Sequence, residues 1–501
     1  MFPTSQTSCH TIECGKPIPV HTPHAVSVSL PTIEDVLCYK ENKNGWRNRI
    51  TAGYPRFYTH PFEIEAVAYI RKARGINESF SVLLFPSQRC AQQLCETLDI
   101  VLEVETISDL CYVRIPYSHP KYEEVVKYIQ RTGSKAYTRQ VEDFLLRESL
   151  VGKLYYEDVI ELSPEEEVKV SLAKYYNVSK DAIRLYSSGM NAIFALFAAL
   201  KKRGEMQAKP LFIQLGMLYF DTMQLLRAYG NELVEIERID SLEELQEVMK
   251  LHRGRVAALF TEVPTNPYLN ICDLPELSKL CQSYGVPLVA DITMGTPINL
   301  NILEHCDFVV ESLTKFASGT GEVMGGMVTS NFQSKYKDEV ERLLDGYGEP
   351  LYTRDAQRLA YTIKGYSLRV TWARESVKQL VTFFSNHPKV KKVHWSHSPE
   401  NLANYSKIST GANCYTPIIS IEFDFPVEQV YDKLKLPKGP SLGTDFTLVM
   451  PYFYMANHDL MRSEADKQKL RERGINPEML RISIGCEPVA RLIGIFDEAL
   501  R

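Results

Sequence analysis

Strands and helices alternate through the middle of the chain, and this alternation is the feature that most restricts its fold. Between residues 132 and 331, short apolar runs are separated by stretches with helical periodicity. The clearest predicted strands are residues 211–214, 256–262, 287–291 and 308–311. Because each strand returns through a helix, the pattern predicts an α/β fold with a mainly parallel central sheet and helices on both faces.

The segment before this part has a different character. Residues 1–50 are rich in Pro, Thr and His and have poor periodicity, which indicates an arm that wraps the body or a partner subunit. A strand predicted at 80–85 and a helix at 90–98 come next, and they indicate a small α/β accessory region.

Helical periodicity over residues 355–386 leads into the last part of the chain. Strands predicted at 417–423 and 480–484 mix there with helices, which favours a smaller C-terminal α+β domain that closes over a site. We therefore predict three parts: an arm with the accessory region (1–131), a large domain (132–385) and a C-terminal domain (386–501).

Composition excludes several classes of protein. The chain has 501 residues, of which 45% are hydrophobic, so it can bury a large core. A net charge of -5 and a pI near 6.2 show no excess of positive charge of the kind that binds nucleic acid or an anionic membrane. No apolar run approaches the roughly 20 residues of a bilayer span, and residues 1–6 lack the pattern of a signal peptide. This composition fits a soluble, cytoplasmic enzyme.

The 11 cysteines are an odd number scattered through the chain, which indicates reduced thiols. Cys9, His10 and Cys14 lie close together, but no second ligand pair is present at the spacing of a zinc site. We therefore predict no metal.

A lysine comes directly after one of the predicted strands. The apolar run 309–310 leads through Glu311 to Ser312, Thr314 and Lys315. Burial removes hydration from an ammonium group and favours the neutral amine, which can form a Schiff base with an aldehyde cofactor. The two hydroxyl groups would add donors for a phosphate. The alternative is a solvated lysine where a strand reaches the surface.

An acid and a glycine turn support the first interpretation. Asp291 ends the strand predicted at 287–291, so it points into the crevice where open α/β sheets bind ligands, and it can keep a pyridine nitrogen protonated. Taken alone, a helix N-cap or loop acid is the simpler interpretation. Gly189 and Met190 begin an apolar helical pattern, where free amides can bind an anion.

The order and spacing of these segments resemble the PLP-dependent enzymes of cysteine and methionine metabolism, from about residue 137 to the C-terminus. The resemblance implies fold type I of the PLP-dependent transferases and pyridoxal 5'-phosphate (PLP) as cofactor. The matching segments are 188–190, 219–222, 262–267, 291–293, 312–315, 323–328 and 480–485.

This resemblance implies a role for each matched residue. The implied catalytic residues are Lys315, Tyr219 and Asp291. Cofactor binding is implied for Ser188, Gly189, Met190, Tyr219, Asn266, Asp291, Thr293, Ser312, Thr314 and Lys315. Substrate binding is implied for Arg481, Ser441 and Asn266, with the guanidinium fork of Arg481 gripping the α-carboxylate.

Tyr137 and Arg139 match a Tyr-x-Arg motif that, in the family, reaches across a dimer interface to the neighbour's cofactor phosphate. The match implies a homodimer or homotetramer with shared active sites. The alternative for this pair is an ordinary amphipathic surface pair.

Residues 22–36 and 53–57 resemble long-chain, fungal-type cystathionine γ-synthases. The implied reaction is a PLP-dependent γ-replacement that joins an O-acylated L-homoserine with L-cysteine to give L-cystathionine, a trans-sulfuration step in methionine biosynthesis. A lyase that performs β- or γ-elimination and an O-acylhomoserine sulfhydrylase need the same cofactor residues. A PLP-binding pseudoenzyme is the non-enzyme alternative.

Two segments depart from the bacterial and animal relatives, at residues 219–222 and 441–446. Phe446 stands where those relatives carry a carboxylate that helps to set substrate choice. Asp221 and Asp445 are nearby acids that would be available to bind the amine of cysteine.

Overall fold

The computed structural model describes residues 9–501, so the start of the chain considered for a signal peptide lies outside the described residues. A seven-stranded central sheet has the order β6-β12-β11-β10-β9-β7-β8. Its strands are β6 (Ile183–Tyr186), β7 (Leu211–Leu215), β8 (Glu232–Ile236), β9 (Val256–Glu262), β10 (Leu288–Asp291), β11 (Phe308–Glu311) and β12 (Gly326–Ser330). Neighbours from β11 to β8 run parallel, and β12 alone in this sheet runs antiparallel to both of its partners. The predicted α/β class is confirmed.

Alternate side chains of the central strands enter two separate cores, because successive residues of a strand face opposite sides of a sheet. Phe308 and Val310 pack into one core, whereas their neighbour Val309 packs into the other. The helices on the first face include α4 (Tyr122–Thr132), α7 (Gly189–Met206), α8 (Phe220–Tyr229) and α11 (Lys337–Leu344). Those on the second include α6 (Pro164–Tyr176), α9 (Glu243–Leu251), α10 (Leu274–Tyr284) and α12 (Thr353–Thr362). This double burial explains why the strands read as continuous apolar runs.

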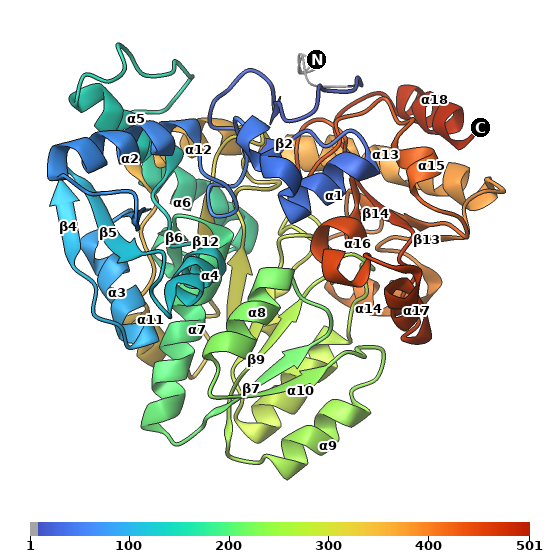
Figure 1. The fold of residues 1–501 in the computed structure, drawn as a ribbon. Helices are drawn as coiled ribbons and strands as arrows, with labels where there is room; N and C mark the ends of the chain where they lie inside the picture. Colours follow the sequence, from blue (N-terminus) through green and yellow to red (C-terminus); the bar gives the residue numbers. More distant parts are fainter. Residues whose placement is uncertain (1–8) are drawn as a thin grey trace.

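A three-stranded antiparallel sheet of order β3-β5-β4 forms the accessory region, on the left of Figure 1. Its elements are β3 (Phe80–Phe85), β4 (Val104–Ile107), β5 (Leu110–Pro116), α2 (Pro61–Arg74) and α3 (Gln88–Leu98). Helix α5 (Thr138–Arg147) packs against this sheet through Val141, Phe144 and Leu145. The accessory body therefore extends past residue 131, where we placed its end.

The C-terminal part holds a four-stranded antiparallel sheet of order β13-β14-β16-β15. The strands are β13 (Lys392–His394), β14 (Ile418–Glu422), β15 (Leu448–Pro451) and β16 (Met479–Ser483). The helices are α13 (Tyr366–Asn386), α14 (Pro399–Ile408), α15 (Glu428–Tyr431), α16 (Tyr452–Ala456), α17 (Glu464–Glu472) and α18 (Val489–Leu500). Helix α13 comes after α12 through the short turn η4 (Ile363–Gly365) and links the two lobes.

The N-terminal arm lies across the top of the molecule in Figure 1 and packs on the C-terminal part. It contains β1 (Pro17–Ile18), β2 (Ser27–Val28), α1 (Ile33–Glu41) and η1 (Lys43–Arg49). Thr32 caps α1 in a capping box with Asp35, and the next amide, Ile33 N, donates to Asp432 Oδ1 at 3.0 Å. Tyr431 Oη donates to the carbonyl of Leu30 at 2.7 Å. In the region that the structure describes, no helix is long and apolar enough to cross a membrane.

Candidate active site

A cavity of about 410 Å³ opens at the carboxyl ends of the central strands. The central domain, the C-terminal part and the N-terminal arm all contribute to its wall. The predicted site residues that line it are Tyr137, Ser188, Gly189, Met190, Tyr219, Asn266, Asp291, Thr293, Ser312, Thr314, Lys315, Ser441 and Arg481. The structure therefore brings together every predicted site residue except Arg139.

Lys315 lies four residues beyond β11, in a turn that its own amide closes by donating to Ser312 O at 3.2 Å. Its Nζ donates to the hydroxyl oxygens of Tyr54 and, at 3.0 Å, Ser441. Burial lowers the pKa of Lys315, and Arg481 adds to this effect, while the contact with Tyr54 opposes it. The amine is thereby shifted toward its neutral, nucleophilic form.

Asp291 ends β10, directly opposite Glu262 of β9 in the parallel register. Its Oδ1 accepts from the amide of Thr293 at 2.8 Å, and the hydroxyl of Thr293 accepts from Ser312 N at 2.8 Å. Burial raises the pKa of Asp291, and burial together with Asp291 raises the pKa of Glu262. Among the described residues no cation pairs with Asp291. A protonated ring nitrogen would supply the missing positive charge, so this carboxylate fits PLP.

Helix α7 points its N-terminus into the cavity. The amides of Gly189 and Met190 are the first two of the helix, so they have no partner within it. A Cβ on Gly189 would lie 2.6 Å from the Cβ of Ser312, so only glycine allows this close approach. These amides and the Ser312 hydroxyl form a donor set that fits a phosphate. The hydroxyl of Thr314 is already engaged, because it accepts from Gly325 N at 3.1 Å and donates to Gly325 O at 3.2 Å.

Arg481, in β16, is buried, with 4% of its surface exposed. Its guanidinium donates to Asn266 Oδ1 at 3.1 Å and to the carbonyl of Ser441 at 2.7 Å. Burial lowers the pKa of Arg481, and no carboxylate pairs with it among the described residues. An unpaired, buried guanidinium that lines a cavity is suited to bind the carboxylate of an amino acid.

Two site residues that we did not predict come from the loop between η1 and α2. Tyr54 Oη hydrogen-bonds Ser441 Oγ at 3.1 Å as well as Lys315, and Arg56 pairs with Asp221 Oδ2 at 2.7 Å. Arg56 also donates to the Tyr219 hydroxyl at 2.8 Å. The segment Tyr54-Pro55-Arg56 has the same Tyr-x-Arg spacing as Tyr137 to Arg139, and this is the signal that would have found it.

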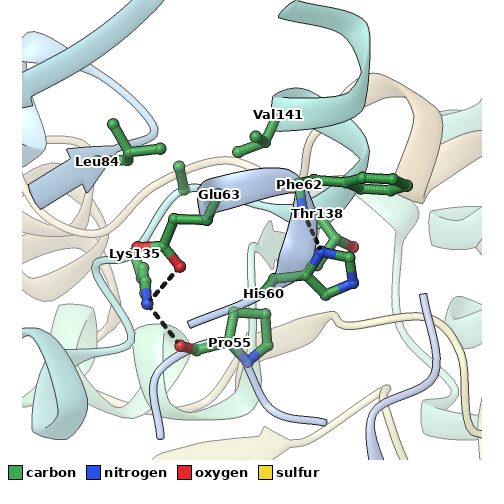
Figure 2. Close-up of a pocket in the computed structure, with 9 residues that line it drawn as sticks. Pro55, His60, Phe62, Glu63, Leu84, Lys135, Thr138 and Val141 are labelled. Carbon is green, nitrogen blue, oxygen red and sulfur yellow. Dashed lines mark hydrogen bonds and ion pairs between the residues drawn. The ribbon is translucent and has the colours of Figure 1, made fainter. Parts of the chain in front are cut away.

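Lys135 fastens the loop that carries these two residues. Its Nζ donates to the carbonyl oxygens of Pro55 at 2.9 Å and Tyr58 at 3.2 Å, and it pairs with Glu63 Oε2 at 2.7 Å. Figure 2 shows Lys135 between Glu63 and Pro55 at the edge of a small pocket. The two carbonyls flank Arg56, so one ammonium group holds the loop on both sides of that residue.

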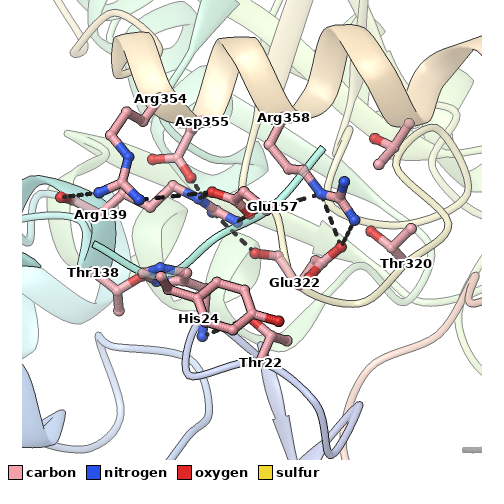
Figure 3. A network of polar contacts seen from close by, with 12 residues as sticks. Thr22, His24, Thr138, Arg139, Glu157, Thr320, Glu322, Arg354, Asp355 and Arg358 are labelled. Atoms are coloured by element: carbon pink, nitrogen blue, oxygen red, sulfur yellow. Dashed lines mark hydrogen bonds and ion pairs between the residues drawn. The ribbon is translucent and has the colours of Figure 1, made fainter. Parts of the chain in front are cut away.

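Arg139 does not line the cavity, which corrects our assignment of it to the cofactor phosphate. Only 1% of its surface is exposed, and its guanidinium pairs with Glu157 at 2.7 Å and with Asp355 at 2.6 Å, while also donating to Glu322 O at 3.1 Å. Figure 3 shows this network. Both carboxylates belong to the same chain, so the partners of this guanidinium lie within one chain and away from the cavity. Tyr137 lines the cavity, and its hydroxyl donates to Pro350 O at 3.4 Å.

Neither of the two acids that we proposed for the amine of cysteine, Asp221 and Asp445, is free in the cavity. Asp445 and Phe446 do not line the cavity, and Phe446 packs in a small core with Ile12. Asp221 lines the cavity but is paired with Arg56. No group of three or more metal-ligating side chains occurs among the described residues.

Comparisons with known proteins show what this chain is similar to. A family model described as Cys/Met metabolism PLP-dependent enzyme matches residues 112–501. L-2-amino-4-chloropent-4-enoate dechlorinase/desaturase from Streptantibioticus cattleyicolor is 32% identical over 488 residues, which are 97% of this chain and 97% of that protein. Cystathionine gamma-synthase from Neurospora crassa is 26% identical over 617 aligned positions that cover 98% of each chain.

A solved structure of cystathionine gamma-lyase from Lactobacillus plantarum, complexed with L-serine, has a TM-score of 0.58 with this chain. It is 20% identical and covers 70% of this chain and 89% of its own. This likeness concerns the fold alone.

Proposed function

The chain belongs to the Cys/Met metabolism PLP-dependent enzyme family, and from this premise we propose that it uses PLP to expel a leaving group from Cγ of an L-2-amino acid. The observation that carries the proposal is the meeting of Lys315 and Arg481 in one cavity, with Tyr54 and Ser441 bonded to the lysine amine. A buried amine base beside an unpaired guanidinium suits an α-amino acid substrate.

When bound, PLP supplies an aldehyde that condenses with amino groups and a ring that accepts electrons from Cα of the substrate. We assign its phosphate to the amides of Gly189 and Met190 and to the hydroxyl of Ser312. We assign its ring nitrogen to Asp291, and we expect Tyr219, which lines the same cavity, to cover the ring.

The amine of Lys315 is placed to move protons on the substrate. Its neutral form, which burial favours, takes the proton from Cα and later one from Cβ. Since the amine accepts one proton at a time, the first must leave before the second is taken. Tyr54 is in contact with Nζ and is the nearest relay. Burial raises the pKa of Tyr54, but the charge and hydrogen bond of Lys315, together with the contacts of Ser441 and Arg56, outweigh it and the pKa is lowered. This keeps the hydroxyl suited to exchanging protons.

Two candidate reactions differ in the step after the leaving group departs. In γ-replacement, L-cysteine adds at Cγ of an O-acylated L-homoserine and gives L-cystathionine, as the name of the relative from Neurospora crassa suggests. In elimination, no thiol adds.

The carboxylates that line the cavity favour elimination. Asp221 is paired with Arg56, Glu262 accepts from Tyr219 N at 2.5 Å, and Asp291 is assigned to the ring. None is left for the ammonium group of cysteine.

The test is to mix the PLP-loaded protein with O-acyl-L-homoserine, with and without L-cysteine, and to follow cystathionine and 2-oxobutyrate by mass spectrometry. Cystathionine that appears only with cysteine establishes γ-replacement, and keto acid released in both reactions establishes elimination. If neither forms from any γ-substituted L-2-amino acid, including a 4-chloro-4-enoate of the kind named for the relative from Streptantibioticus cattleyicolor, the proposal is refuted.

Lys315→Ala tests the assignment of the base. We expect loss of turnover and of the visible absorbance of the PLP-loaded protein, because no other amine in the described cavity wall contacts Tyr54 and Ser441. Lys250→Ala, on the exposed side of α9, is the control and should change neither. Normal turnover by Lys315→Ala would remove Lys315 from the mechanism.

The proposal includes a cytoplasmic homo-oligomer. Light scattering of the purified protein and localisation of a tagged chain test these two points. A monomer that turns over substrate would contradict shared active sites.

A further inference from the structure

The backbone turn that carries Lys315 continues as far as Gly319. Ser318 N donates to Leu313 O at 2.9 Å, and Gly319 N donates to Lys315 O at 2.8 Å. These two bonds close the turn on itself and tie the backbone of Lys315 to the residues that follow it. Whatever holds residues 317–319 therefore also determines where the lysine lies.

A single arginine from another part of the chain lies on this turn. Arg369, in the first turn of α13, donates through Nη2 to Ala317 O at 2.8 Å and to Ser318 O at 2.9 Å. A Cβ on Gly319, where φ is +68°, would lie 2.0 Å from Nε of Arg369. The guanidinium is thus packed directly against the backbone, and only glycine leaves room for it.

The charge of Arg369 has no counter-ion among the described residues, although only 9% of its surface is exposed. Its Nε has no hydrogen-bond partner there either. Burial lowers the pKa of Arg369, and Asp445, which opposes this effect most, forms no ion pair with it. A buried, unpaired charge is costly, and an apolar side chain would fill the same space at less cost. The two bonds to the turn are what the guanidinium adds.

The segment 441–446 also holds this turn. Asp445 N donates to Gly319 O at 2.7 Å, so the last carbonyl of the turn is engaged as well. The same segment begins with Ser441, whose Oγ accepts from Lys315 Nζ at 3.0 Å. The backbone and the amine of the lysine are therefore both held by parts of the chain that come after the central sheet.

We propose that Arg369 is a positioning residue for Lys315, which fixes the turn 315–319 and so keeps Nζ in contact with the hydroxyls of Tyr54 and Ser441. Arg369 does not line the cavity, so it acts through the turn and transfers no proton. The inference rests on the proposed function, because Lys315 is the base there.

The experiment compares Arg369→Met with the wild-type, PLP-loaded, full-length enzyme, using O-acyl-L-homoserine as substrate. We expect kcat to fall about tenfold or more, because a small displacement of the base is enough to slow proton transfer. KM should stay within about twofold, since Arg481 still binds the carboxylate. Arg369→Lys should restore part of kcat, because an ammonium group can donate to the same carbonyls.

A second measurement needs no substrate. The visible circular dichroism of bound PLP depends on the orientation in which the lysine and its surroundings hold the cofactor. Arg369→Met should lose part of this signal, and Arg369→Lys should recover it. Lys378→Met, an exposed residue on the same helix, is the matched control and should change neither the signal nor kcat.

Two further variants separate positioning from stability. Arg139→Met also removes a buried arginine, but one that lies away from the cavity, so it should lower stability and keep the dichroism of the folded protein. If Arg369→Met does not fold, Gly319→Ala displaces the guanidinium from the turn and retains its charge. It should show the same losses of kcat and of dichroism.

Wild-type kcat and dichroism in folded Arg369→Met would overturn the inference, and so would a rise in KM with kcat unchanged. Because the dichroism is recorded without substrate, either result would leave the proposed function intact. Absence of turnover of any γ-substituted amino acid by the wild-type enzyme would instead count against the function itself, while the dichroism still tests the role of Arg369.

Discussion

Replacing Arg139 tests whether this residue stabilises the fold or binds the cofactor. In the structure its guanidinium makes a two-pronged pair with Glu157, with both N–O distances at 2.7 Å, and a 2.6 Å pair with Asp355. Arg139→Met would leave two buried carboxylates without this partner. Breaking a buried ion pair by removing one member costs about 3–5 kcal/mol of the free energy of unfolding.

The assay is urea unfolding of wild type and variant, with the dissociation constant of PLP measured by fluorescence on the folded protein. We expect the unfolding free energy to fall by about 3–5 kcal/mol and the PLP constant to change less than about twofold. Arg147→Met is the matched control, because Arg147 lies on the same helix but pairs with Asp109 at the surface, where such a pair contributes about 0–1 kcal/mol.

The stabilising role of Arg139 would be refuted by a variant that keeps its stability within about 1 kcal/mol of wild type but binds PLP at least tenfold more weakly. That result would restore the hypothesis that Arg139 reaches a cofactor phosphate. If Arg139→Met does not fold, the double variant with Glu157→Gln removes one of the two carboxylates that lose this partner. It should recover part of the loss, because removing both members of a pair costs less than removing one.

Two further predictions concern the way the arm is held. Lys135→Met should release the loop that carries Tyr54 and Arg56, so kcat should fall about tenfold or more while PLP binding changes little. Lys135→Arg should restore part of the rate. An unchanged kcat in Lys135→Met would contradict the role of Lys135 in holding this loop. Burial and Arg139 lower the pKa of His24 to about 4. The unfolded chain therefore binds a proton first as pH falls below about 6.5, and stability should drop by up to about 3 kcal/mol between pH 6.5 and 4. His24→Gln should flatten that dependence in urea unfolding, and an unchanged slope would contradict it.

The parts of the fold that could be predicted from the sequence are those with local causes. Strands β9 and β11 have the predicted bounds, because each is an apolar run buried on both faces of the sheet and cut off by a polar segment. Asp291 is the last residue of β10 and Lys315 lies four residues beyond β11, so the strands determine their place at the carboxyl edge.

The placement of Arg139 away from the cavity has a non-local cause. Tyr54 to Arg56 and Tyr137 to Arg139 have the same spacing, so sequence alone does not separate them. The partner of each arginine does separate them: Asp355 lies 216 positions from Arg139, and Asp221 lies 165 positions from Arg56. The pair of Arg139 and Asp355 is buried between α5 and α12, whereas the pair of Arg56 and Asp221 lines the cavity. A pattern of three residues carries no information about contacts at such separations.

The arm changes how specificity is distributed in this chain. The segment that matches the family begins at residue 112 and contains Lys315, Asp291 and Arg481, the groups assigned to the shared chemistry. Tyr54 and Lys40 lie before it and still line the cavity. Since Tyr54 contacts the base and Lys40 lines the wall, we infer that the segment before residue 112 contributes to proton transfer and to the choice of the γ-substituent, while the matched segment holds PLP. Exchange of the arm between long relatives should then transfer preference among γ-substituents without abolishing PLP binding, and loss of PLP binding in such a hybrid would refute this division.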